Sequence, residues 1–311
     1  MPDPRPIGVF DSGVGGLTVL REIVRRSPAE STIYLGDNAR APYGVRSDEE
    51  VLAFSAQSLD RLAERDVKAI VVACNTSTAV AIGALRRRYD LPILGVIRPG
   101  ASAAALATRN RRVGVIATPA TIRSHAYFAA IKDENPAIEV YEHATPTLVP
   151  LVEAGELAGP IAEAAVADSL APLLGERDAA GESIFPRPPG ATIDTLLLGC
   201  THYPLLRALI AAIAGDRVAI VDSATATASA LAELLSINGL EAAGPVGVGE
   251  GGLTNGADAA HGVTPAARAE VAADHLQLTT GDPAQFHALA SRLFGSAFPT
   301  VEQVDLAVAA R

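Results

Sequence analysis

The chain of 311 residues is poor in several residue types: it has no tryptophan, one methionine, two lysines and two cysteines, Cys74 and Cys200. The cysteines form no Cys-x-x-Cys motif and no histidine stands at a zinc-binding spacing from them, so no metal site is predicted. No apolar run is long enough to span a membrane, and no signal-peptide pattern precedes the first apolar run. We therefore expect a cytoplasmic protein, in a compartment that disfavours a disulfide between the two cysteines.

The charge balance is acidic, with a net charge of −10. Nucleic acids and anionic membrane surfaces are usually bound by basic patches, so neither partner is predicted. A small acidic substrate stays compatible with the composition, because one arginine or one helix N-terminus can attract an anion locally. Hydrophobic residues make up 49% of the chain, enough for a sizeable core, and the length is compatible with two domains.

Short apolar runs alternate with amphipathic stretches along the chain, a pattern typical of α/β folds with mainly parallel sheets covered on both faces. The predicted strands are Ile7–Phe10, Thr32–Leu35, Ala69–Ala73, Ile93–Val96, Val113–Ala117, Thr195–Leu198, Ala219–Val221 and His275–Thr280. The predicted helices include Leu17–Arg26, Glu49–Glu64, Thr76–Tyr89, Thr121–Glu134 and Asp282–Phe294.

An internal repeat relates two parts of the chain. Residues 69–76 and 195–202 each consist of an apolar strand, a small residue, a cysteine, two polar residues and the start of a helix. The strands at 7–10 and 113–116 open the two repeats with similar sequences. The simplest interpretation is two similar α/β domains, each with a cysteine at the same structural point.

Two segments interrupt this pattern. Residues 175–191 contain three closely spaced prolines and are interpreted as an inserted surface loop. Residues 244–265 are rich in glycine and alanine and poor in large apolar residues. Such a composition buries too little apolar surface to offset the entropy of ordering, so we expect a mobile loop.

Both cysteines follow a predicted strand and precede a predicted helix. Ligands of open parallel sheets bind beyond the carboxyl ends of the strands, and a helix N-terminus lowers the pKa of a thiol from its reference value of about 8.5. A lone buried cysteine is more often part of the core, but two at equivalent places favour a functional pair.

The segment Asp11–Leu17 also joins a strand to a helix and contains three glycines. It fails the dinucleotide fingerprint Gly-x-Gly-x-x-Gly, because Thr18 stands where the last glycine is needed. One interpretation is a tight turn capped by Asp11 or Ser12. The other is a loop whose amides bind a substrate carboxylate while Asp11 assists a thiol.

Other polar residues follow predicted strands in the same way: Asp37, Tyr43 with Gly44, and Thr118 with Thr121. Each alone is also an ordinary turn or helix cap. His202, two residues after Cys200, is either a core histidine or a proton partner of that cysteine, and its position favours the second.

Taken together, these motifs resemble those of glutamate racemases, in the cofactor-independent Asp/Glu racemase superfamily. Thr145 stands where many members have a cysteine, and the two loops are longer than in the family. The matching stretches cover nearly the whole chain: Asp11–Leu17, Gly36-Asp37 with Pro42–Gly44, Ala73–Thr76, Val149–Glu153, Gly199–Leu205, Val221–Ala224 and Thr279–Pro283.

The resemblance implies a two-base reaction at Cα of glutamate. Cys74 would deprotonate D-glutamate with the help of Asp11, and Cys200 would deprotonate L-glutamate with the help of His202 and Glu153. The resemblance also implies a set of side chains that hold the two carboxylates and the amine. They are Asp11, Ser12, Tyr43, Gly44, Asn75, Thr76, Thr118, Thr121, Thr201 and His202.

The family resemblance further implies two pseudo-two-fold related domains with the active site in the cleft between them. The first would contain residues 1–98 and 212–311, and the second residues 99–211. It also implies a homodimer that supplies D-glutamate for peptidoglycan synthesis and for cell shape.

No cofactor is predicted. A pyridoxal enzyme needs a lysine for its Schiff base, but Lys68 precedes a buried strand and Lys132 lies in a polar run. Two bases on opposite faces of Cα, one thiolate and one thiol, meet the demand of racemisation without one.

Three alternatives stay open. The first is a related isomerase that acts on aspartate, a hydantoin or maleate. The second is a binding module that kept the fold without turnover, which the retention of both cysteines disfavours. The third is a nucleotide-binding protein, which the missing glycine at Thr18 disfavours.

Overall fold

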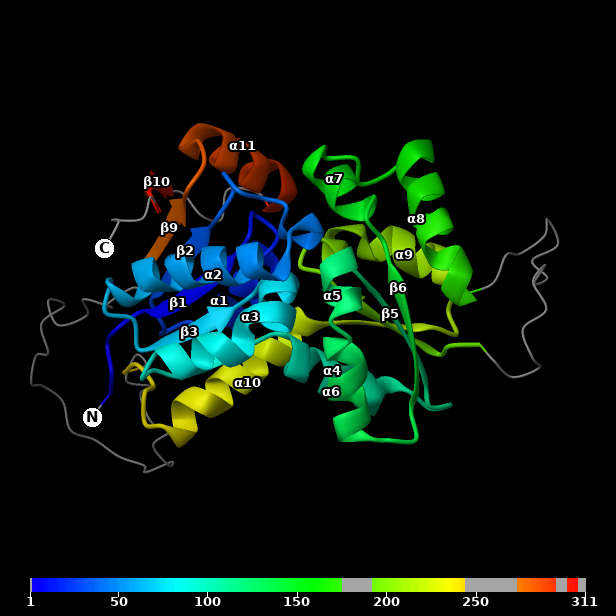
Figure 1. Ribbon diagram of the computed structural model, residues 1–311, viewed down its shortest axis with the longest axis horizontal. Coiled ribbons are helices and arrows are strands. Elements are labelled where there is room, and N and C mark those ends of the chain that lie inside the picture. Colours follow the sequence, from blue (N-terminus) through cyan, green and yellow to red (C-terminus); the bar gives the residue numbers. More distant parts are fainter. Residues whose placement is uncertain (1, 175–191, 244–272, 295–300, 307–311) are drawn as a thin grey trace, which may run out of the picture.

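A computed structural model describes residues 2–174, 192–243, 273–294 and 301–306, so the predicted loops at 175–191 and 244–265 lie outside the described residues. The strands form two parallel sheets, one of six and one of four strands, with helices packed around them (Figure 1). The predicted α/β class with two parallel sheets is confirmed.

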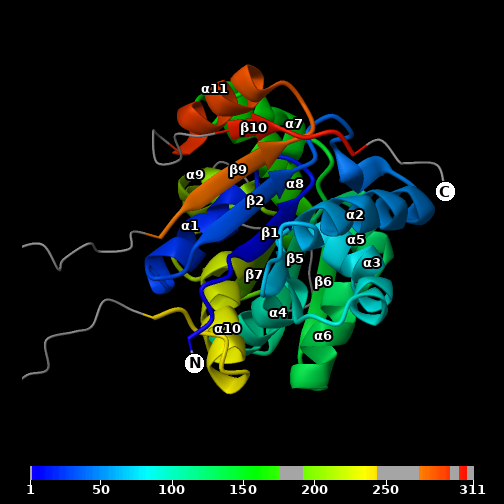
Figure 2. The same ribbon diagram turned by 90° about the vertical axis from the view of Figure 1, so that its left-hand side faces the viewer.

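The six-stranded sheet has the order β10-β9-β2-β1-β3-β4. Helix α1 lies on one side of it, and α2 and α3 lie on the other (Figure 2). Its strands are β1 Ile7–Asp11, β2 Thr32–Gly36, β3 Ala69–Val72, β4 Ile93–Gly95, β9 His275–Thr279 and β10 Val301–Gln303. The helices that follow its strands are α1 Leu17–Arg26, α2 Asp48–Ala63, α3 Asn75–Arg88, α4 Ile97–Ala107 and α11 Pro283–Phe294, with a 3-10 turn at Tyr43–Val45.

The four-stranded sheet has the order β6-β5-β7-β8, the same arrangement as β2-β1-β3-β4 of the first sheet. The repeat seen in the sequence is therefore a repeat of topology, with Cys74 after β3 and Cys200 after β7. Its strands are β5 Arg112–Ala117, β6 Glu139–Ala144, β7 Thr195–Gly199 and β8 Ala219–Asp222. Its helices are α5 Pro119–Arg123, α6 Ala126–Glu134, α7 Leu148–Glu153, α8 Pro160–Leu174, α9 Arg207–Ala214 and α10 Ser223–Ile237, with a 3-10 turn at Tyr203–Leu206. In the described part of the chain, no helix has both the length and the apolar character needed to cross a membrane.

The strand pairing places one segment differently from the expected domain division. Residues 212–311 were assigned to the first domain, but β8 pairs in parallel with β7 and completes the second sheet. The physical reason is the repeat itself, because β8 is the fourth strand of the second unit. Helix α10 then leads back and packs against both α1 and α4.

Two local differences from the sequence prediction have clear causes. The helix expected over residues 121–134 is broken into α5 and α6 at His125, whose φ of 52° lies in the left-handed region. Strand β6 was not predicted, because it is a half-exposed edge strand whose polar residues, such as Glu139 and Glu142, hide the apolar pattern.

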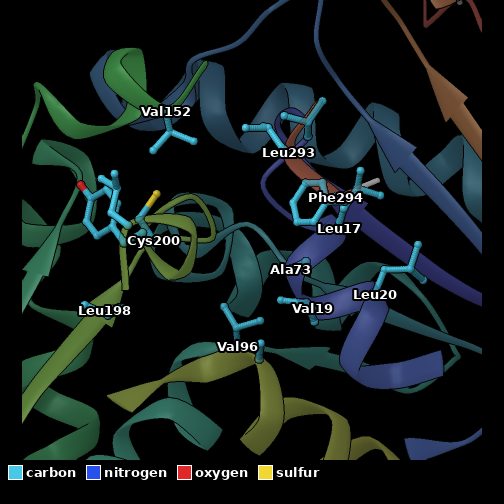
Figure 3. Close-up of a cluster of buried hydrophobic side chains, with 14 of the residues drawn as sticks. Leu17, Val19, Leu20, Ala73, Val96, Val152, Leu198, Cys200, Leu293 and Phe294 are labelled. Atoms are coloured by element: carbon cyan, nitrogen blue, oxygen red, sulfur yellow. The ribbon is translucent and has the colours of Figure 1, made fainter. Parts of the chain in front are cut away.

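One cluster of buried hydrophobic side chains extends from the first unit to the second (Figure 3). Leu17 and Leu20 of α1 and Phe294 of α11 belong to it, as do Leu198 of β7 and Cys200. Cys200 thus stands at the edge of a shared core, and packing of this kind fixes the position of its backbone.

Candidate active site

A pocket lies where the carboxyl ends of the strands of the two sheets meet. Its walls come from the segments after β1, β2 and β3 on one side and after β5, β6 and β7 on the other. The pocket is lined by Ser12, Ala41, Pro42, Tyr43, Gly44, Val45, Cys74, Asn75, Thr76, Thr118, Pro119, Thr145, Pro146, Val149, Pro150, Glu153, Cys200, Thr201 and His202. The two cysteines therefore face one pocket from equivalent places in the two units.

Cys74 is the N-cap residue of α3, and its sulfur accepts the backbone N–H of Ser77 at 3.4 Å. The thiol also lies 3.5 Å from Oγ of Ser12. Burial, together with the negative charge of Asp11, raises the pKa of Cys74 to about 11. The expected lowering of this pKa by the helix N-terminus is thus wrong, because desolvation of the thiolate outweighs it.

Cys200 is paired with an imidazole. Its sulfur lies 3.8 Å from Nδ1 of His202, whose Nε2 lies 3.2 Å from Oε1 of Glu153. Burial lowers the pKa of His202, but the hydrogen bonds to Cys200 and Glu153 outweigh burial and raise it to about 10. His202 is therefore an imidazolium at neutral pH, next to the sulfur of Cys200.

Asp11 lies one layer behind the lining residues, at the end of β1. It is fully buried and accepts hydrogen bonds from the backbone N–H of Gly13 at 3.0 Å and from Oγ1 of Thr201 at 3.3 Å. Burial raises its pKa, against the lowering effects of His202 and these hydrogen bonds. The hydrogen bond from Thr201 to Asp11 connects the segment after β7 of the second sheet to the end of β1 of the first sheet.

Three threonine hydroxyls form a second connection between the units. Oγ1 of Thr76, at the start of α3, lies 2.9 Å from Oγ1 of Thr118 and 3.4 Å from Oγ1 of Thr121. Thr118 caps α5 and lies 3.0 Å from Thr121. Thr76 and Thr118 line the pocket, whereas Thr121 supports them from behind.

The side-chain amide of Asn75 has a hydrogen-bond partner for its oxygen but none for its nitrogen among the described residues. Its Oδ1 accepts the hydroxyl of Tyr127 at 2.6 Å, while its buried Nδ2 has no hydrogen-bond acceptor among the described residues. An unsatisfied buried donor costs about 1–3 kcal/mol, so an acceptor bound in the pocket would relieve this penalty. Tyr127 orients the amide, and no motif in the sequence could have pointed to it.

Tyr43 contributes differently from the hydroxyl groups. Its phenol donates to the carboxylate of Asp37, which also accepts Nε of Arg40 at 2.7 Å, and its ring packs against Phe10 and Phe54. Burial and the charge of Asp37 raise the pKa of Tyr43. The phenol of Tyr43 is therefore occupied by Asp37, and the backbone of Tyr43 and Gly44 is what can bind a molecule in the pocket.

The two lysines lie away from the pocket. Nζ of Lys68 is paired with Oε2 of Glu30 at 2.5 Å, at the end of β3 opposite to Cys74. Nζ of Lys132 donates to the carbonyl of Pro136 at 3.0 Å. Over the ranges that the structure describes, no three histidine, cysteine or acidic side chains form a group that could hold a metal ion.

The two α/β units and the two free cysteines that face one pocket define a class of protein, and a known protein family shows which class it is. The Asp/Glu/hydantoin racemase family matches residues 7–231. The chain therefore belongs to this family of racemases, which are isomerases.

Within the family, the chain is similar to glutamate racemases. That of Lactococcus lactis subsp. lactis is 46% identical over 242 residues, which cover 77% of this chain and 83% of the relative. A glutamate racemase isoform of Bacillus anthracis has a crystal structure with a TM-score of 0.81 and 38% identity, over 98% of both chains. The glutamate racemase of Francisella tularensis subsp. tularensis, solved in complex with D-glutamate, has a TM-score of 0.77 and 32% identity, over 98% of this chain and 99% of that one.

Proposed function

We propose that this protein interconverts L-glutamate and D-glutamate by proton transfer at Cα, with Cys74 and Cys200 as the two bases and without a cofactor. The observation that carries the proposal is the single pocket faced by two cysteines from equivalent strand ends, after β3 and after β7. The similarity to glutamate racemases, one of them solved with D-glutamate, supports the choice of substrate.

The reaction needs one thiolate and one thiol. From D-glutamate, the thiolate of Cys74 takes the α-proton, so that its S–H bond forms while the Cα–H bond breaks and leaves its electron pair on Cα. The thiol of Cys200 then gives its proton to the opposite face, which yields L-glutamate and a thiolate at Cys200. L-glutamate reacts through the same steps in reverse.

The charged groups around the pocket act differently on the two cysteines. The imidazolium of His202 stabilises a thiolate at Cys200, and Glu153 in turn stabilises the imidazolium. Cys74, with its pKa of about 11, is a thiol at neutral pH. A thiol at Cys74 is the acid that the reaction of L-glutamate requires, whereas the reaction of D-glutamate starts from the state with a thiolate at Cys74 and a thiol at Cys200.

Asp11 is proposed to assist Cys74 through a change in its own protonation state. A carboxylate at Asp11 disfavours a thiolate at Cys74, whereas burial raises the pKa of Asp11 and so favours its neutral form. When Asp11 is protonated, this repulsion is absent and the thiolate of Cys74 becomes more accessible.

The polar groups around the pocket are proposed to bind the two carboxylates and the amine. The free Nδ2 of Asn75 suits a carboxylate, and the hydroxyls of Ser12 and Thr201 lie beside the two cysteines. Further contacts would come from Thr76 and Thr118, which Thr121 supports, and from the backbone of Tyr43 and Gly44.

The cellular role follows from the product. We propose that the protein works in the cytoplasm as a homodimer and supplies D-glutamate for peptidoglycan synthesis. These statements rest on the resemblance to glutamate racemases in the motifs around Cys74 and Cys200.

Racemisation is expected to proceed in protein that has been dialysed against EDTA and treated with borohydride. Borohydride reduces and inactivates a pyridoxal Schiff base, but neither lysine lies at this pocket. Circular dichroism of pure L-glutamate, which decays to zero as the racemate forms, measures the rate. Loss of activity after both treatments would contradict the cofactor-free mechanism, and no activity before treatment would contradict the function.

Glutamate is expected to be preferred over aspartate by at least about 10³-fold in kcat/KM. A site built to bind two carboxylates fixes their separation, so a substrate shorter by one methylene leaves buried polar groups unpaired, which discriminates far more strongly than a lost apolar contact. The same circular dichroism assay with both amino acids tests this. Comparable kcat/KM values would instead favour an isomerase of broader or different specificity.

A further inference from the structure

Besides Ser12, a second serine contacts the sulfur of Cys74, and the proposed mechanism does not use it. Ser77, in the first turn of α3, donates its backbone N–H to this sulfur at 3.4 Å, and the interaction of its side chain with the sulfur lowers the pKa of Cys74. On the other side of Ser77, Oγ of Ser55 from α2 donates to Oγ of Ser77 at 2.9 Å. Both serines are fully buried.

The direction of the bond between the serines decides what Ser77 can do. A hydroxyl has one proton to donate. Because Oγ of Ser77 accepts the proton of Ser55, its own proton is left for the sulfur of Cys74. Ser55 thus holds Ser77 as a donor that points along one direction.

A thiolate at Cys74 needs such donors. The ionisable groups that face it are Asp11 at the end of β1, Tyr34 on β2 and Tyr43 in the turn after β2. None of them is a cation: Asp11 repels the thiolate when charged, and both phenols are neutral because burial raises their pKa values. Only hydrogen bonds can therefore offset the cost of burying a thiolate at Cys74, whereas a thiolate at Cys200 has the imidazolium of His202 beside it.

We propose that Ser77, oriented by Ser55, stabilises the thiolate of Cys74 through its hydroxyl and backbone N–H, and that Ser55 is a positioning residue for this base. The proposal rests on the two-thiol mechanism for its catalytic meaning, but the stabilisation of the thiolate can be measured without catalysis.

The first test uses the small number of cysteines. In a Cys200→Ala background, Cys74 is the only thiol in the chain, so its thiolate content at pH 8 is reported by the rate of alkylation by iodoacetamide. We expect Ser77→Ala to lower this rate about tenfold, since one hydrogen bond to an anion shifts a pKa by about one unit. We expect Ser55→Ala to lower it about threefold, because Ser77 keeps its hydroxyl but loses its orientation.

The matched control is Ser58→Ala. Ser58 is equally buried on the same helix as Ser55, but its hydroxyl donates to the backbone carbonyl of Phe54 and not toward Cys74. The rate at which Cys74 is alkylated should be unchanged in Ser58→Ala. In Ser55→Thr, which keeps a hydroxyl, most of the alkylation rate that Ser55→Ala loses should be retained. Equal rates for Ser77→Ala and Ser58→Ala would overturn the proposal.

The second test separates thiolate stabilisation from a merely structural effect. In the protein with both cysteines, Ser77→Ala should slow the proton transfers that involve Cys74 and leave those of Cys200 unchanged. The primary deuterium isotope effect on kcat/KM should therefore rise for α-deuterated D-glutamate and fall for α-deuterated L-glutamate. An isotope effect that changes equally for both enantiomers would count against the role of Ser77. Racemisation that is absent from the parent protein, with the alkylation differences intact, would contradict the function and leave the serine proposal standing.

Discussion

Replacing either cysteine by alanine is expected to lower racemisation by about 10⁴-fold, because no proton can then reach the second face of Cα. The remaining cysteine can still take a proton on its own side and return it. Cys74→Ala should therefore exchange the α-hydrogen of L-glutamate with D₂O, and Cys200→Ala should exchange that of D-glutamate, neither forming the other enantiomer.

The structure adds an asymmetry between these two variants. In Cys74→Ala, the base is Cys200, whose thiolate is stabilised by the imidazolium of His202. In Cys200→Ala, the base is Cys74, whose pKa of about 11 leaves about one thiolate in 10³ molecules at pH 8. Exchange of L-glutamate by Cys74→Ala should thus be the faster of the two at pH 8. Raising the pH toward 10 should accelerate exchange of D-glutamate by Cys200→Ala, because its base deprotonates as the pH approaches 11.

Proton NMR on each enantiomer in D₂O, combined with chiral analysis of the product, measures both quantities. Interconversion of the enantiomers at a near wild-type rate by either variant would show that the two-thiol mechanism is wrong. Exchange confined to the opposite enantiomer in each variant would reverse the assignment of faces while keeping the two bases.

The repeat made most of the fold predictable from the sequence. Strands such as Ala69–Val72 and Thr195–Gly199 are buried on both faces, so their apolar runs are continuous and stand out. The edge strand Glu139–Ala144 lacks this signal because solvent covers part of it. The apolar run Ala219–Val221 predicted a strand, but an apolar run does not indicate which strand lies beside it, so the place of β8 in the second sheet became evident only from its pairing with β7.

The candidate site was predictable where its residues stand next to a strand end in the sequence. Ser12, Cys74, Thr118 and Cys200 were found in this way, and all of them line the pocket. Residues that contact the site from elements far away in the sequence stood in no motif that could predict them. Tyr127 reaches Asn75 from α6 across 52 positions, and Ser55 reaches Ser77 from α2. The pKa of Cys74 was predicted in the wrong direction, since burial is a property of the folded chain.

Gly15→Ala is expected to lower kcat by about 10²-fold or more in a protein that still folds. A methyl group on Gly15 would lie 2.5 Å from both Nδ1 of His202 and Oγ1 of Thr201, closer than nonbonded atoms can approach. Either the imidazole moves away from Cys200, or the loop after β1 moves and takes Asp11 with it. Displacement of a catalytic group by about 1 Å costs about 10²-fold in rate, and overpacking costs about 1–3 kcal/mol of stability.

Gly13→Ala is the matched control, two residues earlier in the same loop. A methyl group on Gly13 would have its nearest neighbours at 3.8 Å, an ordinary contact distance, and the backbone N–H that donates to Asp11 is retained. This variant should keep kcat within about threefold of the wild type, since it displaces no group of the site. Titration of His202 followed by NMR distinguishes the two variants directly: its pKa should stay near 10 in Gly13→Ala and fall in Gly15→Ala. The fall is expected because an imidazole moved away from Cys200 and Glu153 loses the hydrogen bonds that raise its pKa, while the burial that lowers it persists. If Gly15→Ala kept both a wild-type kcat and an unshifted His202, the close packing of this loop against His202 would have no part in catalysis.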